Sequence, residues 1–472
     1  MATKEEELKL QSDGAGESWL DERLDWVRFR AKYLRKPFPV HSSFFLGEIA
    51  LFSFILLVLT GIFLAFSYEP STELVKVGGK DLPGAYASVV QNDQTPFGLI
   101  ARQIHHWSAH IMIAAILIHL LRIFFTGLYK KPREINWVVG VMLLGLTVFA
   151  AFSGYLLPFD QFAVTATGIG YNIARSVPWI GQAIADFVFA GKFPSAAMIP
   201  RFFTYHVVLL PLMLIMLIAL HLLIMFKQKH GQPAYAQALA GSRKILGVPL
   251  WPQQALMMIV LFLILSGSLS LIAGFFPAHP VAYYGPPGPA TPIVKPDWYL
   301  LWPYGALKLI PGWISFEFLG TTINSENIGG VLIPSLILLL LLLIPFFDRS
   351  RRSVHYLELP GEHRVRTAVG VGVLVFFGVL MVAGYDEELG LSVETLQVVA
   401  LLAPLAMGFI TYLGLRWSHQ KSPRSLSQGS TALRKASMDG SSPEASSIRI
   451  SEDNGWQTSG VTATYDEDHG RP

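Results

Sequence analysis

Apolar residues run along this chain in eight long stretches, which are separated by polar loops. The stretches lie near 44–67, 103–126, 136–157, 203–226, 254–276, 329–347, 367–384 and 395–416. Each is long enough to cross the hydrocarbon core of a bilayer as a helix. The pattern therefore predicts an all-α integral membrane protein with eight transmembrane helices. Pro211 and Pro334 fall inside two of the stretches and predict kinks, which neighbouring helices can absorb.

A polar segment precedes the first apolar stretch and ends in an amphipathic sequence. Ser18 can cap a helix that runs to about Lys36, and Pro37 ends it. Its apolar face is formed by Leu20, Leu24, Val27, Ala31 and Leu34. We therefore expect residues 1–43 to form a cytoplasmic tail followed by a helix on the membrane surface. A helix packed on a partner subunit is the alternative.

Basic residues predict the orientation of the chain in the membrane. They concentrate in 28–36, 130–133, 227–244, 349–366 and 416–421, whereas the loops on the opposite side carry few. Basic loops stay on the cytoplasmic side, so we expect both termini in the cytoplasm. The second and fourth apolar stretches then both run from outside to inside.

Composition narrows the chemistry that this chain can support. Of 472 residues, 52% are hydrophobic and 15% are charged, and none is cysteine. Disulfides, iron–sulfur clusters, thiolate-bound metals and covalently attached haem are thereby excluded from this chain. We expect membrane lipid around it and no nucleic acid among its partners. The N-terminal residues lack the basic-then-apolar form of a cleaved signal peptide.

Histidines inside two of the apolar stretches are the main chemical signal. His105 and His119 are 14 residues apart, which on a helix places them roughly 40° apart in rotation and about 21 Å apart in height. His206 and His221 are 15 residues apart in the fourth stretch. Ionisable groups at membrane depth usually mark function. Two such helices predict two bis-histidine haems stacked across the bilayer, where His105 pairs with His206 near the outer face and His119 with His221 near the cytoplasm. A buried, hydrogen-bonded histidine is the alternative for any single one of them.

Glycines repeat the same spacing in the other two helices of this group. Gly47 and Gly61 are 14 residues apart in the first stretch, and Gly140 and Gly154 are 14 apart in the third. Glycine in a helix costs stability but lets another group approach the backbone, and the edge of a porphyrin would need that room at both depths. Small residues for helix packing explain glycines, but not a spacing that matches the histidines. The first four stretches therefore predict a four-helix bundle that holds two haems.

Two arginines and two further histidines accompany this pattern. Arg102 and Arg122 lie one turn beyond His105 and His119, where a haem propionate would emerge; reaching out to the membrane surface is their alternative role. His106 and His110 face away from the ligand face of the helix. We therefore take them as residues that form hydrogen bonds or packing contacts and do not bind iron.

With these histidines, glycines and arginines, the sequence resembles cytochrome b, the membrane subunit of quinol:cytochrome c oxidoreductases. The segments FFLGEIALFSF, RQIHHW, RIFFTG and KKPREINWV are most similar to the cytochrome b of actinobacterial respiratory bc complexes, and the resemblance runs from about Leu24 to about Trp417. It implies a di-haem domain over 44–230 and a C-terminal domain over 231–417. The Ser-rich residues 418–472 are predicted to be a disordered cytoplasmic tail.

The resemblance also implies a quinol-oxidation site in the loop before the sixth stretch. The family has a Pro-Glu-Trp-Tyr motif here, and this chain has Pro296-Asp297-Trp298-Tyr299. The family's carboxylate maps to Asp297, one methylene shorter, and a second site tyrosine maps to Tyr304. Quinol oxidation releases two protons, so a proton acceptor is needed there.

Taken together, the resemblance implies a di-haem subunit that oxidises quinol, with menaquinol as the expected substrate, and drives a proton-motive Q cycle. Expected partners are a Rieske iron–sulfur protein, a c-type cytochrome, a terminal oxidase and a second copy of the complex. A photosynthetic bf-type subunit is the alternative within the class, although the missing cysteine and the fused C-terminal half count against it. A haem-free proton-coupled transporter is the alternative from another class. The sequence assigns no residues to the cytoplasmic quinone site.

Overall fold

We describe the fold from a computed structural model, which covers residues 15–30, 34–35, 37–233, 245–278, 280–289, 294–348, 355–421 and 463–465. Within this described part, eight helical segments are long and apolar enough to span a membrane. They are Ser42–Ser67, Pro96–Phe125, Glu134–Leu156, Met198–Gln228, Leu250–Phe275, Asn327–Phe347, Arg364–Ala383 and Val393–Ser418. Each coincides with one of the predicted apolar stretches, so the eight-helix prediction is confirmed.

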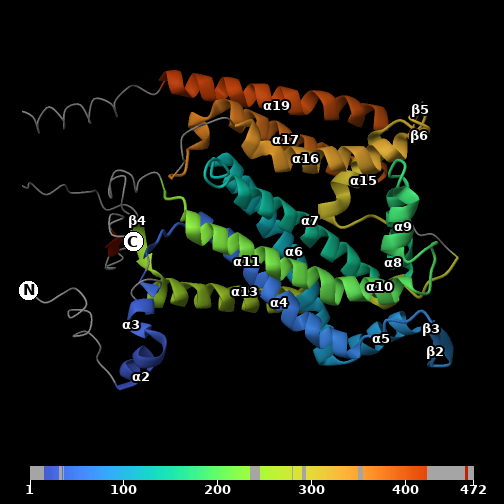
Figure 1. The fold of residues 1–472 in the computed structure, drawn as a ribbon. Coiled ribbons are helices and arrows are strands. Elements are labelled where there is room, and N and C mark those ends of the chain that lie inside the picture. The colour runs from blue at the N-terminus through green and yellow to red at the C-terminus, as the bar shows by residue number, and fades with distance from the viewer. Residues whose placement is uncertain are drawn as a thin grey trace, which may run out of the picture.

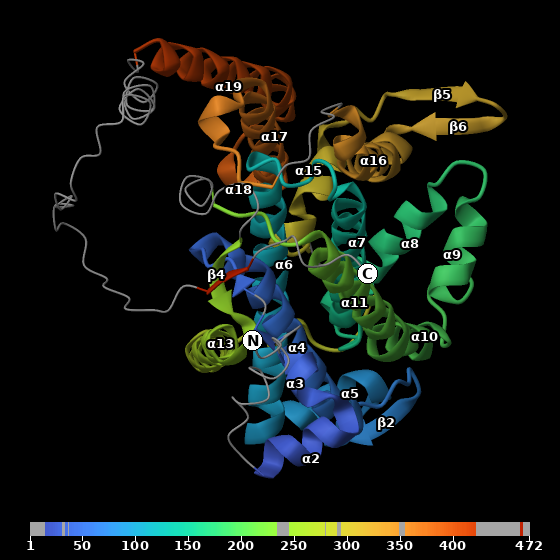
Figure 2. The same ribbon diagram turned by 60° about the vertical axis from the view of Figure 1, so that its left-hand side comes forward.

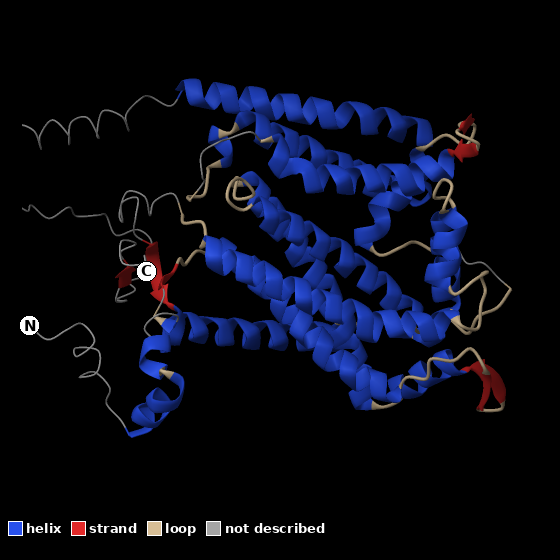
Figure 3. Cartoon of the chain, in the orientation of Figure 1, coloured by secondary structure: helices blue, strands red, loops and turns tan. Residues whose placement is uncertain are grey.

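The spanning helices run side by side, so their connections gather at two ends (Figure 1). We call one the loop end; it holds residues 68–95, 157–197, 276–278, 280–289, 294–326 and 384–392. The other is the basic end, with residues 126–133, 229–233, 245–249 and 355–363. Figure 3 shows that strands occur only at these ends and that helix fills the space between them.

Four spans form the bundle in which the histidines lie. They are α4 (Phe45–Ser67), α6 (Pro96–Phe125), α7 (Glu134–Leu156) and α11 (Leu210–Gln228), of which α4 packs on α6 and α7 packs on α11. Phe54, Met112 and Leu214 are buried together at mid-height. Each lies seven or eight residues from the spaced histidines or glycines of its own span. An apolar layer therefore separates the two levels at which these histidines and glycines lie.

The other four spans pack around this bundle. Helix α13 (Ala255–Phe275) lies against α4 and α6, and α16 (Ile333–Phe347) lies against α7. Helices α17 (Arg364–Ala383) and α19 (Val393–Lys421) pack closely on each other, and α15 (Leu301–Leu309) joins them from the loop end. Figure 2 shows this C-terminal group beside the bundle.

The prolines predicted to kink two spans both follow a π-helical turn. Pro211 comes directly after the turn Tyr205–Leu209, and Pro334 comes after the turn Asn327–Leu332. Proline lacks a backbone N–H and disrupts the regular hydrogen bonds of the preceding turn. A wider turn accommodates it, in keeping with the local distortion that the sequence predicts.

Short helices and two hairpins build the loop end. The helices are α5 (Gly84–Asp93), α8 (Gln161–Arg175), α9 (Gly181–Phe189) and α14 (Val281–Tyr284). Strands β2 (Leu74–Val77) and β3 (Lys80–Pro83) pair through Gly78 and Gly79, whose φ angles are 56° and 80°. Such angles suit a tight hairpin turn. A second hairpin joins β5 (Ser315–Phe318) to β6 (Thr321–Asn324).

The basic end departs from prediction at the N-terminus and near the C-terminus. Instead of one helix from Ser18 to Lys36, the described residues form α2 (Ala15–Leu24) and α3 (Trp26–Phe29), because Asp25 adopts the left-handed conformation at φ 48°. Residues 422–462 and 466–472 of the predicted tail lie outside the described residues, as do residues 1–14. Within the predicted tail, Ala463–Tyr465 forms β7 and pairs with β4 (Ile245–Pro249).

Candidate functional site

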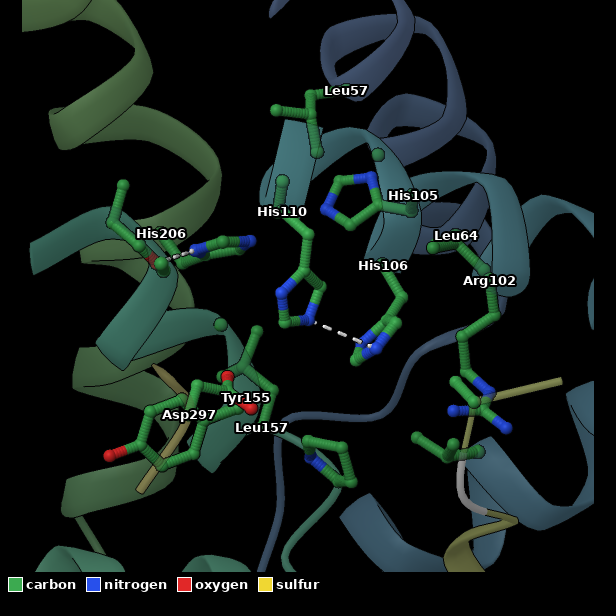
Figure 4. Close-up of a pocket in the computed structure, with 18 of the residues that line it drawn as sticks. Leu57, Leu64, Arg102, His105, His106, His110, Tyr155, Leu157, His206 and Asp297 are labelled. Atoms are coloured by element: carbon green, nitrogen blue, oxygen red, sulfur yellow. Dashed lines mark hydrogen bonds between the residues drawn. The ribbon is translucent and has the colours of Figure 1, made fainter. Parts of the chain in front are cut away.

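At the loop-end level of the bundle, His105 on α6 and His206 in the π-helical turn before α11 face each other. Their ring centroids are 6.1 Å apart, and Figure 4 shows them reaching inward from different helices. Two metal–imidazole bonds of about 2 Å each, with the ring radii added, need about 6 Å between centroids. The spacing therefore suits one metal ion held between the two rings.

Hydrogen bonds fix which nitrogen of each ring is free. The Thr60 hydroxyl donates to the Leu56 carbonyl at 2.6 Å, so its oxygen accepts from His105 Nδ1 at 2.9 Å. His206 Nδ1 donates to the Ala150 carbonyl at 3.0 Å. With the proton on Nδ1, Nε2 of each ring keeps its lone pair for a metal.

The second level, toward the basic end, repeats this arrangement with fewer hydrogen bonds. His119 on α6 and His221 on α11 occupy it, and neither Nδ1 atom has a hydrogen-bond partner among the described residues. Arg122 lies one turn beyond His119, and its Nε and Nη2 atoms are buried and likewise lack hydrogen-bond partners in the described part of the chain. Its guanidinium lies over the Phe44 ring at 4.5 Å.

Each of the four spaced glycines faces one of the four histidine rings. A Cβ built on Gly61 would lie 3.1 Å from His105 Cε1, and one on Gly154 would lie 2.6 Å from His206 Cε1. The corresponding distances are 3.4 Å from Gly47 to His119 and 3.6 Å from Gly140 to His221. In the structure the glycines therefore give room to the imidazole rings, where the sequence analysis expects the edge of a porphyrin.

These features fit haem at both levels. No group of three or more His, Cys, Asp or Glu residues that could hold a metal ion occurs among the described residues, so a metal bound by two histidines needs further ligands from a macrocycle. The unpaired guanidinium nitrogens of Arg122 suit a propionate. Arg102 differs from Arg122 in that its guanidinium is already paired: its Nε and Nη2 atoms each donate to the carboxylate of Asp93 at 2.6 Å.

A cavity of about 590 Å³ connects the loop-end histidines to the loop that carries the Pro-Asp-Trp-Tyr sequence. His105, His206, Gly61 and Gly154 line it on one side, and residues 295–299 line it on the other. The structure therefore brings together two sets of residues that are about 90 or more positions apart in the chain. A cavity of this size accommodates a small molecule.

Three residues of that loop form side-chain hydrogen bonds at the cavity. The Tyr299 hydroxyl donates to Asp297 Oδ2 at 2.8 Å, and burial, with the Asp297 charge beside it, raises the pKa of Tyr299. Tyr299 therefore stays protonated and stabilises the Asp297 carboxylate. The Trp298 indole donates to His110 Nδ1 at 3.0 Å.

His110 and His106, which the sequence analysis treats as residues that do not bind iron, also line the cavity. Because Nδ1 of His110 accepts the indole N–H, a neutral ring carries its proton on Nε2. It then donates to His106 Nε2 at 3.1 Å (Figure 4). Trp298 thus connects the loop 295–299 to α6 through its hydrogen bond to His110.

Tyr304 is not brought to this cavity. It lies on α15, outside the set of residues that line the cavity, and Lys308 Nζ lies 5.5 Å from its ring centroid. Among the tyrosines that line the cavity together with Asp297 are Tyr299 and Tyr155, which lies at the end of α7. Tyr155 lies in the segment SGYLLPFD directly after Gly154, so its closeness to the histidine level was a usable sequence signal.

Two further charged residues of the cavity wall escaped the sequence analysis. Lys295 forms an ion pair with Glu388 and lies 4.5 Å from the ring centroid of Tyr385. Asp160 lies directly before α8, and the Ala163 N–H donates to its Oδ1 at 2.8 Å. Lys295 lies 90 or more positions before its partners Tyr385 and Glu388, so no local sequence pattern indicates these contacts.

Comparison with known proteins agrees with this geometry. Residues 110–286 match the family described as Cytochrome b(N-terminal)/b6/petB, and residues 288–403 match Cytochrome b(C-terminal)/b6/petD. A solved chain of a hyperthermophilic respiratory Complex III shares the fold, with a TM-score of 0.64 and 24% identity over 84% of this chain and 99% of that chain.

Curated relatives include subunits of actinobacterial respiratory complexes. The cytochrome bc1 complex cytochrome b subunit of Streptomyces coelicolor is 35% identical over 383 residues, which cover 78% of this chain and 70% of that protein. The corresponding subunit of Mycobacterium tuberculosis is 34% identical over 422 residues, 84% of this chain and 75% of that protein. This assignment replaces the bf-type and transporter alternatives. The chain therefore belongs to the cytochrome b family, as a multi-pass membrane subunit of the cytochrome bc1 complex, a quinol:cytochrome c oxidoreductase.

Proposed function

We propose that the loop-end cavity is where this subunit oxidises quinol, beside the outer of its two haems. The observation that carries the proposal is the shared cavity, which is lined by His105 and His206 at one side and by Asp297 at the other. A quinol bound along the loop would then lie next to both an electron acceptor and a proton acceptor. Its apolar ring would contact the aromatic and aliphatic side chains that make up most of the wall.

The residues that would hold the haems follow from the histidine pairs. His105 with His206 would ligate the outer haem iron, and His119 with His221 the inner one, while Arg122 would bind a propionate of the inner haem. Bound there, non-covalent b haems supply one-electron transfer and no substrate site, because bis-histidine iron has no open coordination position. Arg102 remains a propionate candidate that shares its guanidinium with Asp93.

The chain itself supplies the proton chemistry. Oxidation breaks two quinol O–H bonds, and the Asp297 carboxylate lies in the cavity wall with one oxygen already accepting the Tyr299 O–H. The other oxygen is available to take a proton from a quinol hydroxyl. The Trp298–His110 hydrogen bond holds this loop against α6 and so keeps the carboxylate at the cavity.

The distribution of basic residues supports an orientation with the loop end outside and both termini in the cytoplasm of a bacterial plasma membrane. One quinol electron would leave through a Rieske iron–sulfur protein toward a c-type cytochrome. The other would cross to a quinone at the basic end, which completes a proton-motive Q cycle. Moving a charge against the membrane potential requires about 2.3 kcal/mol per 100 mV, and quinol oxidation supplies that energy.

The actinobacterial relatives support menaquinol as the substrate, a terminal oxidase as a further partner and a dimeric complex. These assignments rest on the resemblance alone. Extraction and identification of the quinone that copurifies with the complex tests whether menaquinol is the substrate.

Substitution of Asp297 tests the proposed site. Asp297→Asn keeps the shape and removes the proton acceptor, so quinol:cytochrome c turnover in membranes should fall about 10²-fold or more, within the range typical for loss of general-base help. Haem spectra should stay unchanged. Asp297→Glu restores a carboxylate and should recover most of the turnover. Wild-type turnover by Asp297→Asn between pH 6 and 8 would show that this loop performs no proton chemistry.

A further inference from the structure

The arginines one turn beyond the two histidine levels have different partners. Arg102, at the loop-end level, donates from Nε and Nη2 to the two carboxylate oxygens of Asp93, at 2.6 Å each. At the second level, the Nε and Nη2 atoms of Arg122 are buried and have no hydrogen-bond partner among the described residues. Arg102 is therefore held in a bidentate ion pair, whereas two nitrogens of Arg122 are left without a hydrogen bond.

Asp93 lies beside Arg102 because the connection between α5 and α6 is short. Asp93 is the last residue of α5, and Thr95 already caps α6, since its hydroxyl accepts the Gly98 N–H at 3.1 Å. The carboxylate of Asp93 is thus not the cap of α6. It is left to pair with the guanidinium nine positions further along the chain.

The ion pair between Asp93 and Arg102 is largely covered. Each side chain exposes only 16% of its surface. Arg102 and His105 line the same cavity (Figure 4). Water and salt screen exposed charges within about 10 Å, but they screen covered charges much less. The charge of Arg102, and its compensation by Asp93, therefore acts on the position at which we propose the outer haem.

Other charged groups near the two arginines increase this difference. Asp160 is within electrostatic reach of Arg102 and adds a second carboxylate at the loop-end level. Arg122 is within electrostatic reach of the carboxylate of Glu48 and of a second guanidinium, that of Arg133. Among these groups, carboxylates outnumber guanidinium groups at the loop-end level, and guanidinium groups outnumber carboxylates at the other.

Reduction of a haem adds one negative charge, so a nearby cation favours reduction and a nearby carboxylate opposes it. We propose that Asp93 is a positioning residue that lowers the midpoint potential of the outer haem, because it holds Arg102 and neutralises its charge. The inference rests on the proposed binding of that haem by His105 and His206. An outer haem of lower potential passes its electron more readily to the inner level, where the charge of Arg122 remains.

The test is a potentiometric titration of both haems in purified complex, followed by redox-difference spectra. Asp93→Asn keeps the size of the side chain and removes its charge. One unit charge at about 10 Å, with an effective dielectric constant of about 20, changes an equilibrium constant roughly tenfold. We therefore expect the midpoint potential of the outer haem to rise by about 59 mV, the one-electron equivalent of a tenfold change. The inner haem should keep its wild-type potential.

Three further variants separate charge from packing. Asp93→Glu retains the carboxylate and should give a potential close to wild type. Asp81→Asn removes an exposed carboxylate from the β2–β3 hairpin at the same end of the molecule, and it should leave both potentials unchanged because exposed charge is screened. If Asp93→Asn does not retain the outer haem, Asp93→Ser is titrated in its place with the same expectation.

The inference is overturned if the outer potential is unchanged or lower in Asp93→Asn, if both haems shift equally, or if Asp93→Glu shifts as far as Asp93→Asn. Loss of the outer haem from both neutral variants also overturns it, because Asp93 would then be needed to bind the haem and not to set its potential. In all these cases the wild-type complex still holds two b haems. A wild-type complex without an outer haem would instead overturn the proposed function.

Discussion

Gly154 and Gly140 provide a matched pair of substitutions that test the close approach of helix to histidine. At Gly154 an added Cβ would lie 2.6 Å from His206 Cε1, whereas at Gly140 it would lie 3.6 Å from His221 Cε1. Carbon atoms in ordinary contact are about 3.5–4.0 Å apart. Alanine at 154 therefore requires the His206 ring to move by about 1 Å, and alanine at 140 requires no movement.

The displacement at Gly154 affects haem binding directly. His206 Nδ1 is held at 3.0 Å from the Ala150 carbonyl and at 3.2 Å from the Ser153 hydroxyl oxygen, so a 1 Å shift disrupts the hydrogen bond that orients the ring. Overpacking of this kind costs about 1–3 kcal/mol, which corresponds to about 5- to 150-fold weaker binding. Removal of a helical glycine stabilises the helix by up to about 1 kcal/mol at either position.

Redox-difference spectra and potentiometric titration of the two purified variants measure the effect. Gly154→Ala should lose the outer haem in part or shift its midpoint potential, while the inner haem stays as in wild type. Gly140→Ala should retain both haems. If Gly154→Ala kept both haems with unchanged potentials, or if Gly140→Ala were equally damaging, the close-approach reasoning would be refuted.

The remaining predictions concern Tyr299 and Tyr304, the two tyrosines that the sequence analysis names in and after the Pro-Asp-Trp-Tyr motif. Tyr299→Phe removes the hydrogen bond to Asp297 and should slow quinol oxidation severalfold at pH 7, without loss of haem. Tyr304→Phe should leave turnover close to wild type, because this ring lies outside the cavity lining; a larger loss for Tyr304→Phe than for Tyr299→Phe would reverse the assignment. Steady-state turnover with cytochrome c distinguishes the two variants.

The histidine and glycine levels could be predicted because they depend on helix geometry alone. A spacing of 14 or 15 residues returns a side chain to nearly the same face, and the length of the apolar stretches fixes the depth. His105 and Gly61 lie at the same level, although the sequence predicted the edge of a porphyrin against the glycine and the structure places the His105 ring there. The eight spans follow from the same local pattern.

Residues whose positions depend on long connections could not be placed in this way. The site of Tyr304 follows from the packing of α15 on α17, and that of Asp160 from hydrogen bonds between 161 and 285–288. Neither contact leaves a periodic signal. The apolar pattern also fails to predict the break at Asp25. The left-handed backbone of this residue interrupts a helix that the pattern predicts to be continuous.

The central claim is that the four histidines hold two haems, paired by depth. Low-temperature redox-difference spectra of purified complex, combined with haem extraction by acidic acetone, test it most directly. The account predicts two extractable b haems per chain, with loss of the outer signal in His206→Ala and of the inner signal in His119→Ala. A single haem per chain, haem that resists extraction, or loss of the same signal in both variants would contradict it.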